Sequence, residues 1–280
     1  MNERQRTIVA LNAHPDDEAL LSGGTLAGLA SRGHRVVLVT ATDGDAGWAP
    51  AELMESGRLG QVRLAELPRS AAALGAADVI PLLYADSGHL GEVPPDPPGR
   101  RRFVRVPVAE VAERVAEIVR RERADVLLGY DRNGGYGHRD HVHVHHIARA
   151  VAAATDVQLL EATAPRERIL RVLRWVSRVR TLPNDFAIEE WTQAFSPTQE
   201  ITHRIDVRAQ LPAKRAAMLA HASQADGSFP RTLGFILGLP RPLYRLAFGT
   251  EHFLDPTCSP RSGRERRHRD MLDGVQGTDG

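Results

Sequence analysis

The sequence predicts an α/β fold in which a mostly parallel sheet is flanked by helices and carries a smaller C-terminal cap. The main observation is that apolar, β-branched segments of strand length alternate with segments of helix length, which is typical of βαβ units. A second observation is size, because 280 residues with 42% hydrophobic side chains can bury about three quarters of the unfolded chain's surface. The single cysteine, Cys258, indicates a core without disulfides.

Five strands are expected where aliphatic and β-branched residues cluster, at residues 7–11, 36–40, 79–83, 126–130 and 157–160. Four helices are expected between them, at residues 20–32, 53–74, 108–123 and 140–154. Pro68 lies inside the second of these helices and predicts a kink or a break there. With helices between successive strands, the expected sheet is Rossmann-like.

The remaining segments are expected to add a loop, a cap and a tail. Glycine and proline recur through residues 84–106, which indicates one long loop of the kind that forms lids or binding loops. Short β-like stretches at 186–207 and a helix at 208–222 indicate a cap at about 185–255, within a single domain of residues 1–258. Residues 259–280 have few hydrophobic side chains, and we expect a disordered tail there.

The charge balance argues against nucleic acid and membranes as partners. The chain has 36 Lys and Arg against 35 Asp and Glu, so no chain-wide field attracts polyanions. Its N-terminal apolar stretch is too short for a signal peptide, and the apolar segment 233–239 is far shorter than the ~20 residues of a transmembrane helix. We therefore expect a cytoplasmic protein, for which a homo-oligomeric state is compatible with the sequence.

The first cluster of candidate site residues is Ala13-His14-Pro15-Asp16-Asp17-Glu18, where the first strand gives way to a helix. Ligands bind at that edge of an open parallel sheet. A bound cation would offset the repulsion between these acids, and His14 and Asp17 are suited to converge on zinc. Asp16 points in a different direction and is a candidate general base beside the metal. A helix-capping cluster is the alternative for the acids, but it leaves His14 unexplained.

The second cluster is Tyr136-Gly137-His138-Arg139-Asp140-His141, after the fourth strand. His138 and His141 share a face at the start of the next helix, so one of them completes the metal site while the other stays unbound. Counting His141 as the ligand gives three nitrogen and oxygen donors and leaves a fourth position for water, as in catalytic zinc sites. Ordinary structural or surface roles are expected for the other histidines of this helix, which are His143, His145 and His146.

Two other enzyme classes are excluded by missing motifs. A dinucleotide-binding enzyme requires G-x-G-x-x-G after the first strand, where this chain instead has carboxylates that would repel a pyrophosphate. A serine hydrolase requires G-x-S-x-G at a strand-to-helix turn, and the sequence has no such string. Hydrolysis at a metal centre is the chemistry that the two clusters favour.

On these motifs the chain resembles the PIG-L (LmbE-like) family of zinc-dependent N-deacetylases. In motif it looks most like the actinobacterial N-acetylglucosaminyl-inositol deacetylases of mycothiol biosynthesis. Further matches are Thr42-Asp43-Gly44-Asp45, Arg63-Leu64-Ala65-Glu66 and His221-Ala222-Ser223-Gln224. Arg139 departs from the pattern, since the family commonly has proline at that position.

The resemblance implies a Zn²⁺ site, with Fe²⁺ as the alternative ion, formed by His14, Asp17 and His141. It implies that Asp16 is the base that activates the zinc-bound water. It also implies that His138 stabilises the oxyanion and protonates the leaving amine, and that Asp140 orients His138. Tyr136 is implied to be an oxyanion donor or a loop gate.

For the substrate, the resemblance implies that Asp86 contacts sugar hydroxyls and that Arg63 contacts the inositol side. The alternatives from the residues themselves are an i,i+3 salt bridge between Arg63 and Glu66 and a turn-forming role for Asp86. The implied reaction is removal of acetyl from an N-acetylglucosaminyl-type small molecule.

Two other functions share these features. A tailoring deacetylase or amidase that acts on an aminosugar natural product or a thiol conjugate would carry the same catalytic residues, and residues 186–207 and 233–244, which should shape the pocket, show no specific match. A non-catalytic carbohydrate-binding protein belongs to a different class, and it would not need the acid–base groups Asp16 and His138.

Overall fold

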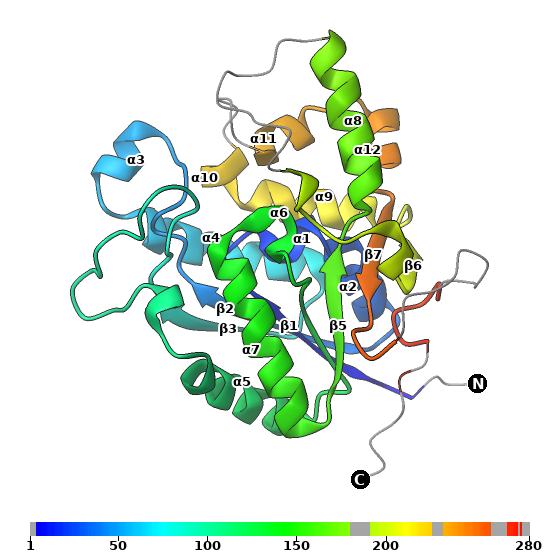
Figure 1. The fold of residues 1–280 in the computed structure, drawn as a ribbon, viewed down its shortest axis with the longest axis horizontal. Helices are drawn as coiled ribbons and strands as arrows, with labels where there is room; N and C mark the ends of the chain where they lie inside the picture. Colours follow the sequence, from blue (N-terminus) through cyan, green and yellow to red (C-terminus); the bar gives the residue numbers. More distant parts are fainter. Residues whose placement is uncertain (1–3, 180–190, 226–231, 259–267, 274, 276–280) are drawn as a thin grey trace.

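In a computed structural model of the chain, seven strands form one sheet in the order β3-β2-β1-β4-β5-β7-β6 (Figure 1). The structure describes residues 4–179, 191–225, 232–258, 268–273 and 275. The first five strands run parallel, whereas β7 pairs antiparallel with both β5 and β6. The strands are β1 (Thr7–Asn12), β2 (Arg35–Thr42), β3 (Asp78–Tyr84), β4 (Val126–Tyr130), β5 (Gln158–Thr163), β6 (His203–Asp206) and β7 (Thr250–Leu254).

Helices cover both faces of this sheet, and all five predicted strands are confirmed. Apolar side chains of α5 and α7 pack with Val9 and Leu11 on one face. Those of α2 and α4 pack with Ile8 and Ala10 on the other face. The α-helices in the described residues are α1 (Asp17–Leu20), α2 (Gly23–Ser31), α3 (Ala51–Glu55), α4 (Leu59–Leu74), α5 (Val108–Glu122), α6 (Gly134–Gly137), α7 (Arg139–Thr155), α8 (Arg166–Val179), α9 (Leu211–Ala220), α10 (Ala222–Ala225), α11 (Thr232–Leu237) and α12 (Arg241–Phe248).

Two predicted helices are each divided in two, and the break expected at Pro68 is wrong. The segment 20–32 forms α1 and α2, and the segment 53–74 forms α3 and α4, with Gly57 between them at a φ of +65°. Helix α4 continues through Pro68. Because Pro68 is exposed, water can reach the backbone groups that its ring leaves without partners, so the helix need not break there.

The C-terminal part of the chain extends the main sheet. Within the range expected to form a cap, β6 and β7 join the sheet beyond β5, and α9, the helix predicted at 208–222, packs its Leu211 and Met218 with Leu74 of α4. Residues 185–190 and 226–231 of the expected cap lie outside the described residues, as do 259–267, 274 and 276–280 of the expected tail. In the described part of the tail, Met271 is buried against the sheet.

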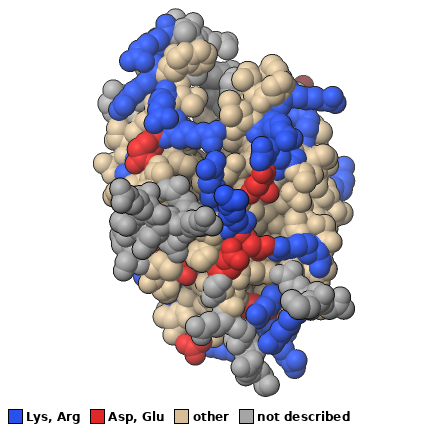
Figure 2. Space-filling view, turned by 90° about the vertical axis from the view of Figure 1, so that its right-hand side faces the viewer, with Lys and Arg blue, Asp and Glu red and all other residues tan. Residues whose placement is uncertain are grey.

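Charged side chains of both signs share the surface. On the face drawn in Figure 2, basic side chains are interspersed with acidic and uncharged ones, as the formal net charge of +1 leads one to expect. In the part of the chain that the structure describes, no helix combines the length and apolar character needed to cross a bilayer.

A buried ion pair joins the C-terminal part to the first half of the fold. Lys214 Nζ lies 2.5 Å from Glu251 Oε1, and the two side chains are 1% and 2% exposed. The same carboxylate accepts hydrogen bonds from the backbone N–H groups of Gly24 and Thr25, at 2.9 and 2.7 Å, which lie in the first turn of α2 where the helix dipole favours an anion. Glu251 therefore connects β7, α9 and α2.

Removing one member of this pair should destabilise the protein strongly. Lys214→Met leaves the Glu251 carboxylate buried without its cation, and we expect the free energy of unfolding to fall by about 3–5 kcal/mol. Urea denaturation of the variant and the parent protein measures this difference. Arg101→Ala, which breaks the exposed ion pair with Glu110, is the control, with an expected loss of at most ~1 kcal/mol. Equal losses in the two variants would contradict the prediction.

Candidate metal and catalytic site

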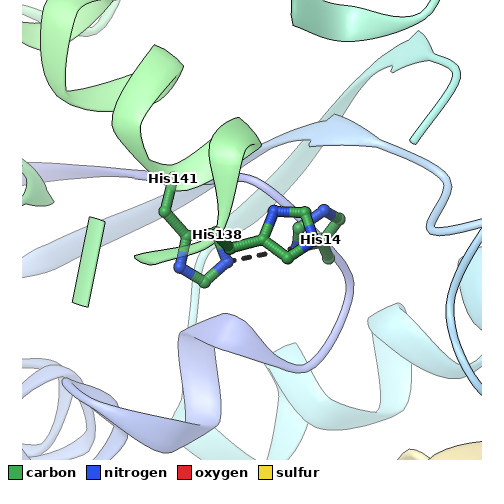
Figure 3. A group of neighbouring side chains, drawn as sticks. All are labelled: His14, His138 and His141. Atoms are coloured by element: carbon green, nitrogen blue, oxygen red, sulfur yellow. Dashed lines mark hydrogen bonds between the residues drawn. The ribbon is translucent and has the colours of Figure 1, made fainter. Parts of the chain in front are cut away.

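The two predicted clusters meet at one edge of the sheet. Strands β1 and β4 are neighbours, so the segments that follow their carboxyl ends emerge side by side. Figure 3 shows the side chains of His14, from the first segment, and of His138 and His141, from the second, gathered in one group. All three are at least 95% buried. The convergence predicted from the sequence is therefore confirmed.

Two of these histidines and the nearby Asp17 provide three donor atoms with the spacing of a metal site. His14 Nδ1 lies 3.2 Å from His141 Nε2 and 3.2 Å from Asp17 Oδ2, and His141 Nε2 lies 3.3 Å from the same Asp17 oxygen. Tetrahedral ligands at zinc–donor distances near 2.0–2.1 Å lie about 3.3 Å apart. The donor set and its geometry therefore fit a divalent metal ion held by His14, Asp17 and His141.

The surroundings of these donors favour positive charge. Burial alone would lower the pKa of His14, but Asp86, Asp140 and Asp17 outweigh it and hold the pKa well above the ordinary value. Burial likewise would raise the pKa of Asp17, yet contacts with His141 and His14 hold it well below its usual range. The cluster is thus built to hold a cation among carboxylates.

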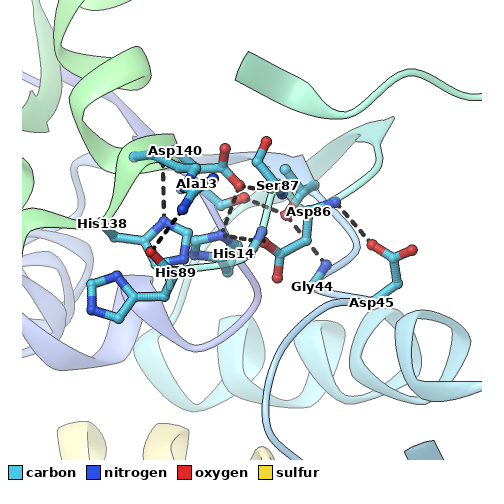
Figure 4. Close-up of polar contacts among 12 residues, drawn as sticks. Ala13, His14, Gly44, Asp45, Asp86, Ser87, His89, His138 and Asp140 are labelled. Atoms are coloured by element: carbon cyan, nitrogen blue, oxygen red, sulfur yellow. Dashed lines mark hydrogen bonds and ion pairs between the residues drawn. The ribbon is translucent and has the colours of Figure 1, made fainter. Parts of the chain in front are cut away.

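Asp140 contributes to the site through two different groups, as Figure 4 shows. Its Oδ2 atom lies 3.2 Å from His14 Nε2 and accepts the Ser87 backbone N–H at 2.9 Å. A carboxylate on the far nitrogen of a metal-binding histidine is the usual way to orient that ring. The Asp140 backbone N–H donates to His138 Nδ1 at 3.1 Å, so the predicted partner of His138 contacts it through the main chain.

This hydrogen bond defines which nitrogen of His138 carries a proton. Because Nδ1 accepts the Asp140 N–H, the neutral ring carries its proton on Nε2. Burial, together with the electrostatic effect of the neighbouring His14 and His141, holds the pKa of His138 well below its ordinary value. His138 is therefore a neutral hydrogen-bond donor beside the metal cluster.

The long loop contacts both His138 and Arg139, the residue at the position where the resemblance leads one to expect proline. The His89 ring stacks on His138, with centroids 5.1 Å apart and planes 13° apart. Arg139 donates from Nη2 to the carbonyl oxygens of His89 and Gly91, at 3.1 and 2.7 Å. The loop predicted at 84–106 thus borders the site. Tyr136 lies at the rim of the site. Its side chain is 40% exposed, and its ring is edge-on to His89 and His138.

Asp16 lies outside the triangle of donor atoms. It occupies the N-cap position of α1, but its side chain makes no capping hydrogen bond, so the capping alternative does not account for it. Asp16 Oδ1 instead lies 3.2 Å from Arg63 Nη2. Burial raises the pKa of Asp16 to about 6, against the opposing charge of Arg63, which places this carboxylate near the range of an effective general base at neutral pH.

Arg63 and Asp86 are both buried among protein partners. Arg63 donates to the carbonyl oxygens of Pro15 and Gly44, at 2.6 and 3.0 Å, whereas Glu66 binds the backbone and hydroxyl of Ser223. The Arg63–Glu66 salt bridge is therefore not the observed arrangement. Asp86 Oδ1 accepts the Gly88 N–H, as a turn residue does, and lies 3.5 Å from His14 Nε2. Their contacts with substrate stay predictions.

Sequence reasoning missed Asp131, which positions the glycine loop before His138. Its fully buried carboxylate accepts the Gly135 N–H at 2.9 Å and the hydroxyls of Thr163 and Ser196 at 2.5 and 2.9 Å. The signal was an acid directly after a buried strand and before a glycine pair. At Gly134, a Cβ would lie 2.7 Å from the Val142 nitrogen, so no other residue fits that turn.

The additional histidines of α7 take structural contacts, as predicted. His143 Nε2 lies 3.0 Å from the Val106 carbonyl oxygen, and His145 Nδ1 lies 3.1 Å from that of Tyr130. His146 is exposed. None of the three belongs to the groups of potential metal-binding side chains found in the described residues.

The fold and the site define an α/β metal-dependent hydrolase. A family model described as "PIG-L: GlcNAc-PI de-N-acetylase" matches residues 9–152, and the chain belongs to the PIG-L family. A 1D-myo-inositol 2-acetamido-2-deoxy-alpha-D-glucopyranoside deacetylase from Thermomonospora curvata is 33% identical over 308 aligned positions that cover 99% of each chain. The predicted family, and hydrolytic N-deacetylation as the class of reaction, are confirmed.

Solved structures of deacetylases share the fold. The N,N'-diacetylchitobiose deacetylase from Pyrococcus horikoshii aligns with a TM-score of 0.57 and 21% identity, over 90% of this chain and 83% of the other. The A40926 pseudoaglycone deacetylase Dbv21 aligns with a TM-score of 0.59 and 18% identity, over 90% of this chain and 97% of the other. At these identities the likeness confirms the predicted α/β architecture.

Loss of one donor should remove the metal without unfolding the protein. We expect His141→Ala and Asp17→Asn to retain far less zinc than the parent protein after dialysis, because a three-ligand site loses most of its affinity with one donor. Metal analysis by plasma mass spectrometry checks this, and circular dichroism monitors folding. His146→Ala, on the same helix but exposed, is the control. Full zinc occupancy in both cluster variants would refute the assignment.

Proposed function

We propose that this protein removes the acetyl group from an N-acetylglucosaminyl-inositol, with Zn²⁺ held by His14, Asp17 and His141. The observation that carries the metal part is the triangle of donor atoms with sides of 3.2–3.3 Å. The substrate part rests on the relative that spans nearly the whole chain and is named for this deacetylation. Fe²⁺ is the second candidate ion, since the same donors suit it. A cytoplasmic location belongs to the same proposal.

Asp16 is the proposed base. When bound, the metal ion supplies Lewis acidity that polarises the acetyl carbonyl and makes water a better nucleophile. Asp16 is assigned to proton transfer because it neither belongs to the donor triangle nor caps α1, and because Arg63, the partner of its Oδ1, accepts no proton. With a pKa raised to about 6 by burial, its carboxylate is mostly ionised at pH 7 yet basic enough to accept a proton from the attacking water.

His138 is the proposed donor to the reacting amide. Its Nε2–H is available because Nδ1 is occupied by the Asp140 N–H. A neutral imidazole donor stabilises the negative charge that develops on the carbonyl oxygen. Because a neutral ring that lost this proton would become an imidazolate, the departing amine nitrogen takes the proton that Asp16 accepted from the water. Tyr136, partly exposed at the rim, is the proposed second donor or gate.

Arg63 and Asp86 have a positioning role in this proposal before any contact with substrate. Arg63 holds the Asp16 carboxylate and the Pro15 carbonyl oxygen. Asp86 faces the far nitrogen of His14, where a carboxylate fixes the ring and increases the basicity of the metal-binding nitrogen. A substrate hydroxyl that reaches either side chain must share it with these protein partners.

Replacing the base should abolish most turnover while the metal stays bound. Asp16→Asn removes the proton acceptor and preserves the side chain's size, so we expect turnover to fall by about 10²–10⁴-fold at unchanged zinc content. Amine release from the N-acetylglucosaminyl-inositol, with metal analysis of the same sample, measures both quantities. Asp96→Asn, which alters an exposed acid, is the control. Near-parental turnover in zinc-loaded Asp16→Asn would rule out the role.

A substrate screen tests the proposed specificity. We expect kcat/KM for the N-acetylglucosaminyl-inositol to exceed that for free N-acetylglucosamine and for an N-acyl aminosugar glycopeptide by at least ~10-fold, because contacts to the second ring add binding energy in the transition state. Preference for the glycopeptide would favour a tailoring deacetylase. Zinc-loaded protein that binds these sugars without releasing amine would favour a carbohydrate-binding protein.

A further inference from the structure

A buried acid–imidazole pair lies next to the proposed base but outside the metal cluster. Glu18 Oε1 is 2.6 Å from His221 Nε2, and both side chains are fully buried. The Ser70 hydroxyl donates to the same Glu18 oxygen at 2.5 Å. A carboxylate removed from water needs such partners. They come from distant parts of the chain, because Ser70 is in α4 and His221 lies between α9 and α10.

The second oxygen of Glu18 contacts the backbone of Asp16. Glu18 Oε2 accepts the Asp16 N–H at 3.0 Å. Asp16 has a φ of +113° and a ψ of −25°, a conformation that is strained for a residue with a side chain and persists only where the surroundings hold it. The contacts that hold Asp16 are the Glu18 hydrogen bond at its N–H, the Ala19 N–H at its carbonyl oxygen (3.0 Å) and Arg63 at its carboxylate.

The segment that carries His221 is itself fixed to α4. Ser223 donates from its backbone N–H and from its hydroxyl to the two oxygens of Glu66, at 2.8 and 2.7 Å. Hence His221 is held in place by a contact that does not involve Asp16. The motif His221-Ala222-Ser223-Gln224, to which the sequence assigned no role, therefore has two parts with different tasks: Ser223 anchors the segment and His221 fixes Glu18.

We propose that Glu18 and His221 are positioning residues for Asp16, which hold its backbone in the positive-φ conformation that directs its carboxylate away from the cap of α1 and toward Arg63. This inference rests on the proposed role of Asp16 as the base. Glu18 acts through its hydrogen bond to the Asp16 N–H, and His221 acts through Glu18. Neither residue binds the metal, and neither has to exchange a proton during the reaction.

The pair has a test that separates positioning from general stability. Glu18→Gln preserves the shape of the side chain but exchanges one acceptor for a donor, and His221→Asn removes the imidazole. In zinc-loaded protein we expect each substitution to lower kcat by about 10²-fold, the usual cost of a misplaced catalytic group, at nearly unchanged KM and zinc content. Asp125→Asn is the matched control: it changes another buried carboxylate that binds a basic side chain and a backbone N–H, those of Arg6 and Thr7, at the opposite ends of β1 and β4. It should lower the melting temperature while kcat stays near the parental value.

The double variant Glu18→Gln, Asp16→Asn tests whether Glu18 affects kcat through Asp16. If Glu18 acts through Asp16, Glu18→Gln has no further effect on kcat in the Asp16→Asn background, whereas a general structural defect lowers the residual activity again. A crystal structure of Glu18→Gln should show Asp16 with a changed φ. Parental kcat in folded Glu18→Gln, or a full additional loss in the double variant, would overturn the inference. Unchanged turnover in Asp16→Asn alone would instead overturn the proposed function on which it rests.

Discussion

The structure of the site depends on three donor atoms held 3.2–3.3 Å apart where little water can reach them. Two imidazoles and a carboxylate at these distances need partners that fix their rings and balance their charge. The surrounding acids supply that balance, and Tyr130 stacks on His141 with centroids 4.2 Å apart. The parallel pairing of β1 with β4 brings the donors together, so the sheet topology is a requirement of the site.

Much of this arrangement could be predicted from the sequence, because its causes are local or periodic. The strands follow from runs of buried aliphatic residues, and the parallel sheet places the segments after β1 and β4 at one edge. His14, Asp17 and His141 could be selected since residue type and spacing limit which side chains converge. The departures have equally physical causes: Pro68 is tolerated because it faces solvent, and Gly57 breaks the helix because it adopts a positive φ.

The contacts around these donors could not be predicted in the same way. Asp140 was expected to orient His138, and the contact that joins the two residues is made by the Asp140 backbone N–H. Sequence patterns identify a residue type and cannot say which of its polar groups is used. Asp131 and Glu18 were missed as positioning groups for a related reason, since their partners come from Ser196 and His221, far along the chain. Such pairings depend on tertiary packing.

The contribution of His221 affects how the extent of the active site should be defined. Every donor of the triangle lies within residues 9–152, the region matched by the family model, yet the imidazole that neutralises Glu18 is 203 positions further on. A fragment ending after α7 would keep the full set of metal-binding side chains and lack this partner. An inventory of ligands is therefore a poor guide to how much of the polypeptide a working enzyme of this architecture requires.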